Sequence, residues 1–327
     1  MTGSIDLLLK RLLGEEKFLL TTHRTPDPDG LGAELGLLHF LKSKGKDALI
    51  MNSEPVPVKM RFLDPENQAS DMKSLKDRAI IDGRLIVCVD NSDLKRIDDL
   101  QAYVREDQSN LVIIDHHDGM HADNQVMFAF PTTGSSCEIV YELMTLGGVE
   151  PTEPVARSLY AGIVSDTGNF KYKKTNSRTH EIAAHLMRFG INPAEVAERL
   201  FENSPLARLL LKKKLYAGMV IEQGRLAYFK IRKSDVIELG LSLDDLDGVV
   251  NELIESDDIQ AGILFTEREA QQTKVSVRSR GSISMLASVV KYGGGGHKNA
   301  CGATIPMDLE TAIADFIPEA LRCLDSV

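Results

Sequence analysis

Residues 21–30 read TTHRTPDPDG, and this stretch decides how the rest of the chain is organised. The apolar run at 17–20 predicts a short buried strand before it, and the helical spacing of apolar residues over 31–43 predicts a helix after it. His23, Asp27 and Asp29 are therefore expected on a proline-stiffened loop between a strand and a helix. A DPDG turn that simply caps the helix is the plainer interpretation of the same residues.

Electrostatic repulsion between the two acids favours a bound cation at this loop. At a separation of ~4 Å and an effective dielectric constant of ~20, two carboxylates repel each other by about 4 kcal/mol. The loop has no nearby lysine to relieve that repulsion. A divalent cation would relieve it directly.

The composition limits the kinds of partner that the protein can bind. The chain has 327 residues, of which 43% are hydrophobic, so it is long enough for a large core and two domains. Its formal net charge of -10, from 48 acidic and 38 basic residues, disfavours binding to long nucleic acids, which requires a broad basic surface. A small anionic ligand held in a local basic pocket or by metal ions is compatible with this charge.

The cysteines and the N-terminal residues indicate the expected cellular compartment. Four widely spaced cysteines form no CxxC pair, which argues against a zinc site or a disulfide framework and predicts reduced, buried thiols. Residues 1–17 mix charges among leucines, which predicts an amphipathic helix rather than a signal peptide. No apolar run is long enough to span a membrane, and a cytoplasmic protein is expected.

Acids and histidines follow the predicted strands of the first half of the chain at the points where the strands end. Strands and helices alternate here, which predicts a parallel α/β sheet. The apolar run 84–89 stops at Asp90, and the run 111–114 stops at Asp115, His116 and His117. Because ligands of open α/β sheets gather at the carboxyl ends of the strands, these residues predict a functional site.

The connections between these strands add one more candidate acid. The hydroxyl-rich stretch 132–136 is predicted to cap a helix over 137–146, and its hydroxyls could also bind an anion. A helix over 154–164 ends just before Asp166, which is either an ordinary turn residue or a further acid of the site. Residues 55–71, after a strand at 47–51, are expected to be loop-rich or irregular.

The last third of the chain predicts a second, smaller α/β domain. Strands are expected over 226–231, 261–265 and 273–278. Because side chains alternate along a strand, Ser276, Arg278 and Arg280 are expected on one face of the last of these strands.

A run of four glycines at 293–296 comes directly before His297. Consecutive glycines cost conformational entropy on folding, so they suit a place where backbone N–H groups must approach a phosphate closely. A merely flexible connection is the alternative. The adjacent histidine favours a phosphate-binding loop made by Gly294, Gly295, Gly296 and His297.

Taken in order, these motifs resemble those of the DHH phosphoesterase superfamily, in the subfamily with a C-terminal DHHA1 domain. Each motif is weak alone, but the ordered set covers essentially the whole chain and is highly specific. In size and layout the chain looks like the stand-alone bacterial nanoRNases and pAp phosphatases of the NrnA type. RecJ exonucleases carry additional domains, and family II pyrophosphatases have a different C-terminal domain.

The resemblance implies a division of the chain and a position for the active site. A parallel-sheet DHH catalytic domain would span 1–190, a helical linker 191–219 and a mixed α/β DHHA1 domain 220–327. The active site would lie in the cleft between the two domains.

The resemblance also implies two manganese ions and a role for each motif residue. One ion would be held by His23, Asp27 and Asp90, and the other by Asp29, Asp90, His116 and Asp166, with Asp90 bridging. Asp115 would orient the histidines as a catalytic residue of the centre, and His117 would face the substrate phosphate. The substrate would also be bound by Ser276, Arg278, Gly294, Gly295, Gly296 and His297.

The implied activity is two-metal hydrolysis of phosphoesters, in which the ions lower the pKa of a shared water and clamp the nonbridging phosphate oxygens. The implied substrates are short oligoribonucleotides, cleaved from one end, and 3'-phosphoadenosine 5'-phosphate (pAp). Cyclic dinucleotides such as c-di-AMP and their linear products are the alternative, and pyrophosphate or polyphosphate is less favoured. The sequence does not separate short oligoribonucleotides, pAp and c-di-AMP or its linear product. Relatives are commonly dimers, so a homodimer is a further expectation.

Two hypotheses from other classes fit the sequence less well. Gly30, Gly32 and Gly36 open a helix at nearly the spacing of a dinucleotide-binding fingerprint, but the last glycine is one residue late. A non-catalytic nucleotide-binding or RNA-binding module would tolerate the loss of metal ligands, whereas every expected ligand is present.

Overall fold

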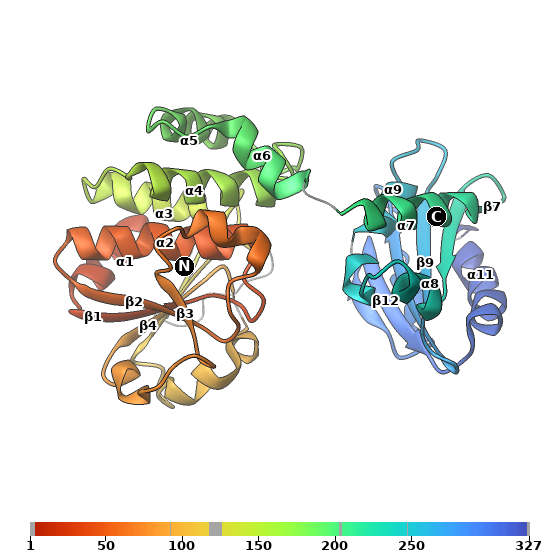
Figure 1. Ribbon diagram of the computed structural model, residues 1–327, viewed down its shortest axis with the longest axis horizontal. Helices are drawn as coiled ribbons and strands as arrows, with labels where there is room; N and C mark the ends of the chain where they lie inside the picture. The colour runs from red at the N-terminus through yellow and green to blue at the C-terminus, as the bar shows by residue number, and fades with distance from the viewer. Residues whose placement is uncertain (1–3, 92, 118–125, 203–204, 247, 326–327) are drawn as a thin grey trace. The chain divides into compact units, whose positions relative to one another are not determined.

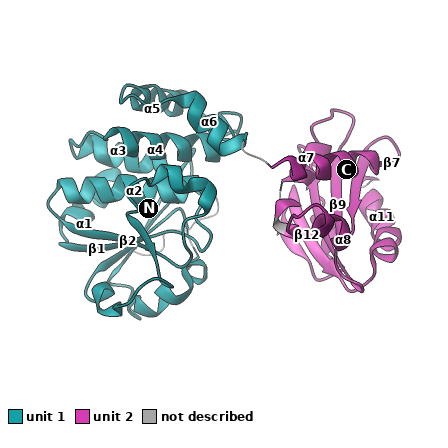
Figure 2. Ribbon diagram, in the orientation of Figure 1, with its two compact units in different colours: residues 1–203 teal, residues 204–327 magenta. Residues whose placement is uncertain are grey.

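The chain forms two compact units, at residues 1–203 and 204–327, here called the first and the second unit (Figure 2). The computed structural model describes residues 4–91, 93–117, 126–202, 205–246 and 248–325. Each unit has its own sheet and its own hydrophobic cores.

The first unit is built on a six-stranded sheet in which every pair of neighbouring strands is parallel, as predicted. The strand order is β3-β2-β1-β4-β5-β6. Two strands were not predicted, β3 and β6, because each has three residues, too few for a hydrophobic period; β3 lies in the stretch expected to be irregular. The strands are β1 (Lys17–Thr21), β2 (Asp47–Asn52), β3 (Ala69–Asp71), β4 (Leu85–Val89), β5 (Leu111–Asp115) and β6 (Met127–Ala129).

Both faces of this sheet are covered, which explains the almost uninterrupted apolar runs of β4 and β5. Residues alternate between two cores, as Phe18 and Leu20 face one core and Leu19 the other. Helices cover one face, together with the 3-10 segment at Val58–Leu63, and two further 3-10 segments cover the other, as Figure 1 shows for α1 and α2. The helices are α1 (Ile5–Leu13), α2 (Pro28–Ser43), α3 (Ser136–Leu146), α4 (Glu153–Asp166), α5 (Ser177–Met187) and α6 (Pro193–Phe201), and the 3-10 segments are Val58–Leu63, Arg78–Ile81 and Leu94–Tyr103.

The predicted N-terminal amphipathic helix is α1. Its Leu8 and Leu12 are fully buried against the core, whereas Leu7 is half exposed. In the part of the chain that the structure describes, no helix is both long and apolar enough to cross a membrane. All four cysteines are buried, and no disulfide joins any of them.

The glycines of α2 serve close helix packing rather than phosphate binding. A Cβ on Gly30 would lie 2.4 Å from the Thr22 hydroxyl, and one on Gly32 would lie 2.4 Å from the carbonyl oxygen of Ser158 in α4. A Cβ on Gly36 would lie 2.8 Å from a Leu159 methyl. These contacts leave no room for a pyrophosphate against the glycines, so the dinucleotide-binding hypothesis is wrong.

The second unit has a six-stranded mixed sheet of order β11-β12-β10-β9-β8-β7, in which only the β8–β9 pair is parallel among the described strands. Helices pack on both faces and close two separate cores. The strands are β7 (Val220–Glu222), β8 (Leu226–Ile231), β9 (Ala261–Glu269), β10 (Gln272–Ser279), β11 (Gly295–His297) and β12 (Ala300–Ile305). The helices are α7 (Leu206–Ala217), α8 (Lys233–Glu238), α9 (Val249–Leu253), α10 (Leu286–Val290) and α11 (Leu309–Asp325), with a 3-10 turn at Leu243–Leu246.

The helices of the expected linker, 191–219, belong to different units. Val196 of α6 is buried in a core of the first unit, and Leu211 and Leu215 of α7 are buried in a core of the second. Residues 203–204, which connect the two helices, lie outside the described residues.

Candidate metal centre

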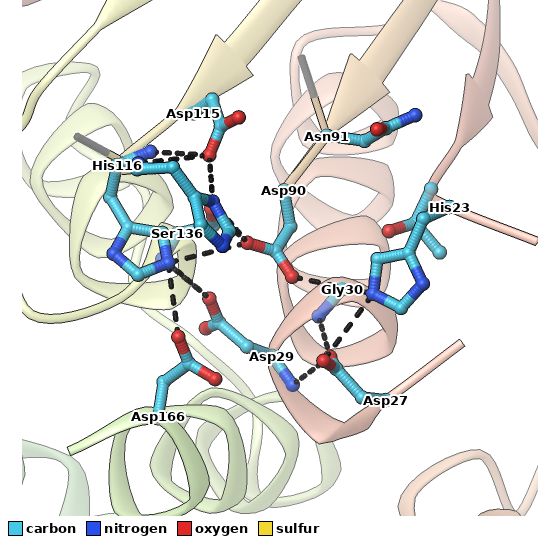
Figure 3. A network of polar contacts seen from close by, with 12 residues as sticks. His23, Asp27, Asp29, Gly30, Asp90, Asn91, Asp115, His116, Ser136 and Asp166 are labelled. Carbon is cyan, nitrogen blue, oxygen red and sulfur yellow. Dashed lines mark hydrogen bonds and ion pairs between the residues drawn. The ribbon is translucent and has the colours of Figure 1, made fainter. Parts of the chain in front are cut away.

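The carboxyl edge of the first sheet gathers the candidate ligands from four separate segments of the chain, around residues 23–29, 90, 116 and 166 (Figure 3). His23 follows β1, Asp90 follows β4, and His116 follows β5. Asp27 and Asp29 lie at the start of α2, and Asp166 is the last residue of α4. Residues far apart in the sequence thus meet at one edge, as predicted for an open α/β sheet.

Asp27 both caps α2 and faces His23. Its Oδ1 accepts the backbone N–H groups of Asp29 at 3.0 Å and Gly30 at 2.9 Å, which is a helix N-cap. Its other oxygen, Oδ2, lies 3.3 Å from Nε2 of His23. One oxygen of the Asp27 carboxylate therefore caps the helix, and the other is placed as a metal ligand. The turn interpretation and the ligand interpretation are both compatible with this geometry.

Asp29 is fully buried and is anchored by the N-terminus of α3. Its Oδ2 accepts the backbone N–H of Ser136 at 2.7 Å, and its Oδ1 accepts that of Cys137 at 2.9 Å. Unpaired N–H groups and the positive end of the helix dipole favour an anion at this position. The anion at this helix terminus is thus a carboxylate of the protein itself, and Ser135 provides the predicted cap by accepting from Glu138 N–H.

Asp90 lies between the other candidate ligands. It is buried and has a left-handed backbone with φ of 55°. Its Oδ2 lies 3.7 Å from Nε2 of His23, and its Oδ1 lies 3.3 Å from Nε2 of His116. The Ser136 hydroxyl donates to the same Oδ1 at 3.2 Å, which fixes the carboxylate between the two imidazoles.

His116 has the contacts expected of an imidazole ligand rather than of a hydrogen-bonded core histidine. Its Nε2 lies 3.0 Å from Asp166 Oδ2 and 3.7 Å from Asp29 Oδ2. Neither ring nitrogen, however, forms a hydrogen bond of acceptable geometry within the described part of the chain. Nε2 therefore points into the space between the carboxylate oxygens.

Asp115 orients His117 but not the ring of His116. Its Oδ1 lies 2.7 Å from His117 Nδ1 and accepts the backbone N–H groups of His116 at 2.7 Å and His117 at 3.2 Å. The expectation that it would orient both histidines thus fits the ring of His117 alone. The His117 side chain is 53% exposed, so its Nε2 is open to a ligand.

Three overlapping groups of side chains, each with its ligand atoms within 4.8 Å of one another, could hold metal ions. The first is made by His23, Asp27 and Asp90, the second by Asp29, Asp90, His116 and Asp166, and the third by Asp90, Asp115, His116 and His117. The first two are the sets that the resemblance implies, with Asp90 common to both. The chemistry fits a pair of divalent cations, because the four carboxylates balance two divalent charges and the Nε2 of His116 lacks a hydrogen bond.

Charges within the centre shift the pKa values of its members. Burial lowers the pKa of His23, but contacts with Asp27 and Asp90 outweigh it and raise that pKa to about 9. The same balance, with Asp166 and Asp90 as partners, raises the pKa of His116 to about 11. Burial raises the pKa of Asp29, whereas for Asp90 the two histidines outweigh burial and lower the pKa. Cations that bind here must therefore displace protons from the imidazoles.

The remaining predicted site residues lie in the second unit, on β10 and β11. Ser276 and Arg278 share the less buried face of β10, while Val275 and Val277 of the opposite face are in the core. Arg280 follows the end of β10, and its guanidinium bonds Asp257 at 2.9 Å.

The glycine run is partly an edge strand rather than a loop. Gly295–His297 forms β11 and pairs with β12, and the N–H groups of Gly293 and Gly294 are bonded to the carbonyls of Val290 and Val289. A Cβ on Gly294 would lie 2.3 Å from the Gly302 carbonyl oxygen. A Cβ on Gly295 would meet nothing within 4 Å, so packing does not explain that glycine.

Comparison with known proteins assigns both units to families. Residues 17–163 match the model of the DHH family, N-terminal domain, and residues 223–326 match that of the DHHA1 domain. The chain belongs to the DHH family and carries a C-terminal DHHA1 domain. The predicted superfamily, the α/β fold class and the hydrolase class are thereby confirmed.

Curated relatives and solved structures resemble the chain along most of its length. The bifunctional oligoribonuclease and PAP phosphatase NrnA of Thermus thermophilus is 29% identical over 94% of this chain and 90% of its own length. NrnA of Bacillus subtilis is 29% identical over 91% of this chain and 92% of its own length. The cyclic-di-AMP phosphodiesterase GdpP of Geobacillus thermodenitrificans is 26% identical over 92% of this chain but only 46% of its own length. An exopolyphosphatase-related protein from Bacteroides fragilis has the same fold, with a TM-score of 0.86 at 24% identity, over 97% of this chain and 95% of its own.

The sequence motifs did not reveal several polar groups that support the DHH domain ligands. The backbone N–H groups of Ser136 and Cys137 hold Asp29, and Lys174 Nζ donates to the His116 carbonyl at 2.7 Å. The hydroxyl-rich start of α3 was a usable signal for the first of these. Lys174 is 58 residues from its partner, and no local pattern connects the two.

Proposed function

We propose that this protein is a manganese-dependent phosphoesterase that hydrolyses short oligoribonucleotides from one end and also pAp. The observation that carries the proposal is the pair of ligand groups in the DHH domain that share Asp90. Two cations joined by a common carboxylate suit an in-line displacement at phosphorus. A mixed carboxylate and imidazole set suits manganese.

The residues of the DHH domain divide the work of hydrolysis. When bound, the two ions would supply an acidified water and would polarise the phosphate oxygens. Asp90 would hold both ions, because one of its oxygens faces His23 and the other faces His116. His117 donates its Nδ1–H to Asp115, a contact that raises the pKa of His117, and the protonated ring also has an Nε2–H that can donate to a phosphate oxygen. Asp115 thus acts on the reaction through His117.

The DHHA1 domain would select the substrate by binding the group at the end of the substrate chain. We assign this role to Ser276, Arg278, Gly294, Gly295, Gly296 and His297. Gly295 supports the assignment, because it lies on an edge strand and no packing contact requires a glycine there. Arg278 supplies a cation suited to a terminal phosphate.

The choice of substrate follows the relatives that this chain matches over nearly their whole length. Both NrnA proteins are named for oligoribonuclease and PAP phosphatase activity. Cyclic-di-AMP or its linear product is the second candidate, since GdpP is also a relative, although the match covers less than half of that protein.

A side-by-side assay of pAp, diribonucleotides, c-di-AMP and pyrophosphate with manganese tests the proposal. We expect the highest kcat/KM for diribonucleotides and pAp, and no turnover of any substrate in the presence of a chelator. Dominant turnover of pyrophosphate would overturn the substrate choice. Binding of these nucleotides without hydrolysis, in the presence of manganese, would instead indicate a non-catalytic nucleotide-binding module.

A further inference from the structure

A fully buried glutamate, Glu34, lies in α2 and has no part in the proposed reaction. Its neighbours in the helix, Leu31, Leu35, Leu37 and Leu38, are buried apolar residues of the core. Its Oε2 accepts a hydrogen bond from Nδ2 of Asn52 at 3.0 Å, and its Oε1 has no hydrogen-bond partner among the described residues. A carboxyl group in such surroundings is unfavourable for folding, so its presence requires another explanation.

Asn52, the partner of Glu34, joins the ends of two neighbouring strands. It is the last residue of β2, and its Oδ1 accepts the backbone N–H of Thr22 at 3.2 Å and the hydroxyl of Thr21 at 3.3 Å. The side chain thus continues the β1–β2 pairing one residue beyond the end of β1. Because Thr22 presents an N–H donor, Oδ1 must face Thr22 and Nδ2 must face Glu34.

The next residue after Thr22 is His23, whose Nε2 belongs to the group made with Asp27 and Asp90. We propose that Glu34 is a positioning residue that acts through Asn52 and Thr22 to hold His23 in its half of the metal centre. The inference rests on the proposed function, because it assumes that this group of atoms binds a cation. Glu34 itself touches none of the candidate ligands through a hydrogen bond that the structure shows.

The other half of the centre is anchored independently of Glu34. Asp29 is held by the N-terminus of α3, and Asp166 is carried by α4. Loss of the Glu34 acceptor should therefore weaken cation binding at His23, Asp27 and Asp90 while leaving the second group nearly unchanged. A residue that only filled space in the core would not produce such a selective effect.

The test compares two variants of the full chain with the wild type. Metal-free protein is titrated with manganese, and binding is measured by calorimetry and by the electron paramagnetic resonance signal of free Mn²⁺. Glu34→Leu keeps the volume but removes the acceptor for Asn52. Glu34→Gln keeps an oxygen that can accept from Nδ2. We expect two sites in the wild type and in Glu34→Gln, and one site weakened about 10- to 100-fold in Glu34→Leu.

Each outcome separates the inference from the proposed function. A wild type that binds no manganese contradicts the proposed function. A wild type with two sites and a folded Glu34→Leu variant with the same two affinities overturns the inference, and so does equal weakening of both sites. Should Glu34→Leu fail to fold, Asn52→Ala decides in its place, since it removes the next link and must weaken the same single site.

Discussion

Asp90 contributes carboxylate oxygens to both groups of ligand atoms in the DHH domain, so it is the residue whose loss should damage both metal positions. Its backbone is left-handed, with φ of 55°, a conformation that asparagine tolerates better than most residues. Asp90→Asn therefore removes the charge with little change in backbone strain. We expect a loss of kcat of at least about 10³-fold and weaker binding of both manganese ions, with an unchanged circular dichroism spectrum. Asp107→Asn, an exposed turn residue, is the control. Retention of one tight manganese site in Asp90→Asn would show that the carboxylate does not bridge.

The imidazoles of the centre predict how manganese binding depends on pH. The pKa values of His23 and His116 are raised to about 9 and about 11, so both rings are protonated near neutral pH in the metal-free protein. Binding of a cation to either ring releases a proton, and manganese affinity should rise with pH until about pH 9 for the His23 half. Titration calorimetry in buffers of different ionisation enthalpy measures this release. A binding enthalpy that does not depend on the buffer would contradict the prediction.

The stability of the metal-free protein should change with pH in the direction opposite to manganese affinity. A raised histidine pKa contributes stability that is complete below the unfolded value of about 6.5 and is lost as the pH rises through the folded value. For His23 the loss should extend to about pH 9. Metal-free protein should therefore become less stable over the same range in which manganese binds more tightly.

At the scale of elements, the centre depends on the close approach of α2, α3 and α4. A Cβ on Gly162 of α4 would lie 2.3 Å from Cys137 Sγ and 2.9 Å from Asp29 Cα. Alanine at this position gains up to ~1 kcal/mol of helix propensity, but the overlap costs about 1–3 kcal/mol and pushes α4 away from Asp29. We expect Gly162→Ala to lower the melting temperature and to weaken manganese binding at Asp29 and Asp166. Gly14→Ala, whose Cβ would meet atoms at no less than 3.5 Å, should do neither.

Two neighbouring glycines of the DHHA1 domain separate a packing role from a ligand role. Gly294→Ala places its Cβ 2.3 Å from a carbonyl oxygen and should destabilise the protein by about 1–3 kcal/mol. Gly295→Ala places its Cβ in open space and should change stability by less than about 0.5 kcal/mol. If backbone at Gly295 approaches the substrate, the same change should raise KM for pAp roughly tenfold, or about 1.4 kcal/mol. Unchanged KM in Gly295→Ala would remove the glycine run from the substrate site.

Sequence patterns predicted those elements whose signal is local. The strand ends at His23, Asp90 and His116 follow uninterrupted apolar runs, and their chemistry could be recognised from order and spacing alone. The short strands β3, β6 and β11 have three residues each and are formed by pairing with a neighbour, which no period reveals. The hydrogen bond from the Ser136 N–H to Asp29 joins residues 107 positions apart, so it could be recognised only once the fold was known.

For the whole molecule, the candidate metal ligands that the structure brings together all come from the first unit, and the predicted substrate residues in the glycine run and on β10 come from the second. Each unit closes its own hydrophobic cores, so each should fold when expressed alone.

We expect the isolated segment 1–203 to bind two manganese ions as the full chain does. It should hydrolyse a small chromogenic phosphodiester at a rate within about tenfold of the full chain, because the chemistry needs only the DHH domain residues. Its kcat/KM for pAp and diribonucleotides should fall by at least about 10²-fold, since the groups proposed to bind the substrate end are absent. A folded segment 1–203 that binds no manganese would place an essential ligand in the DHHA1 domain, and full activity on pAp would remove that domain from substrate selection.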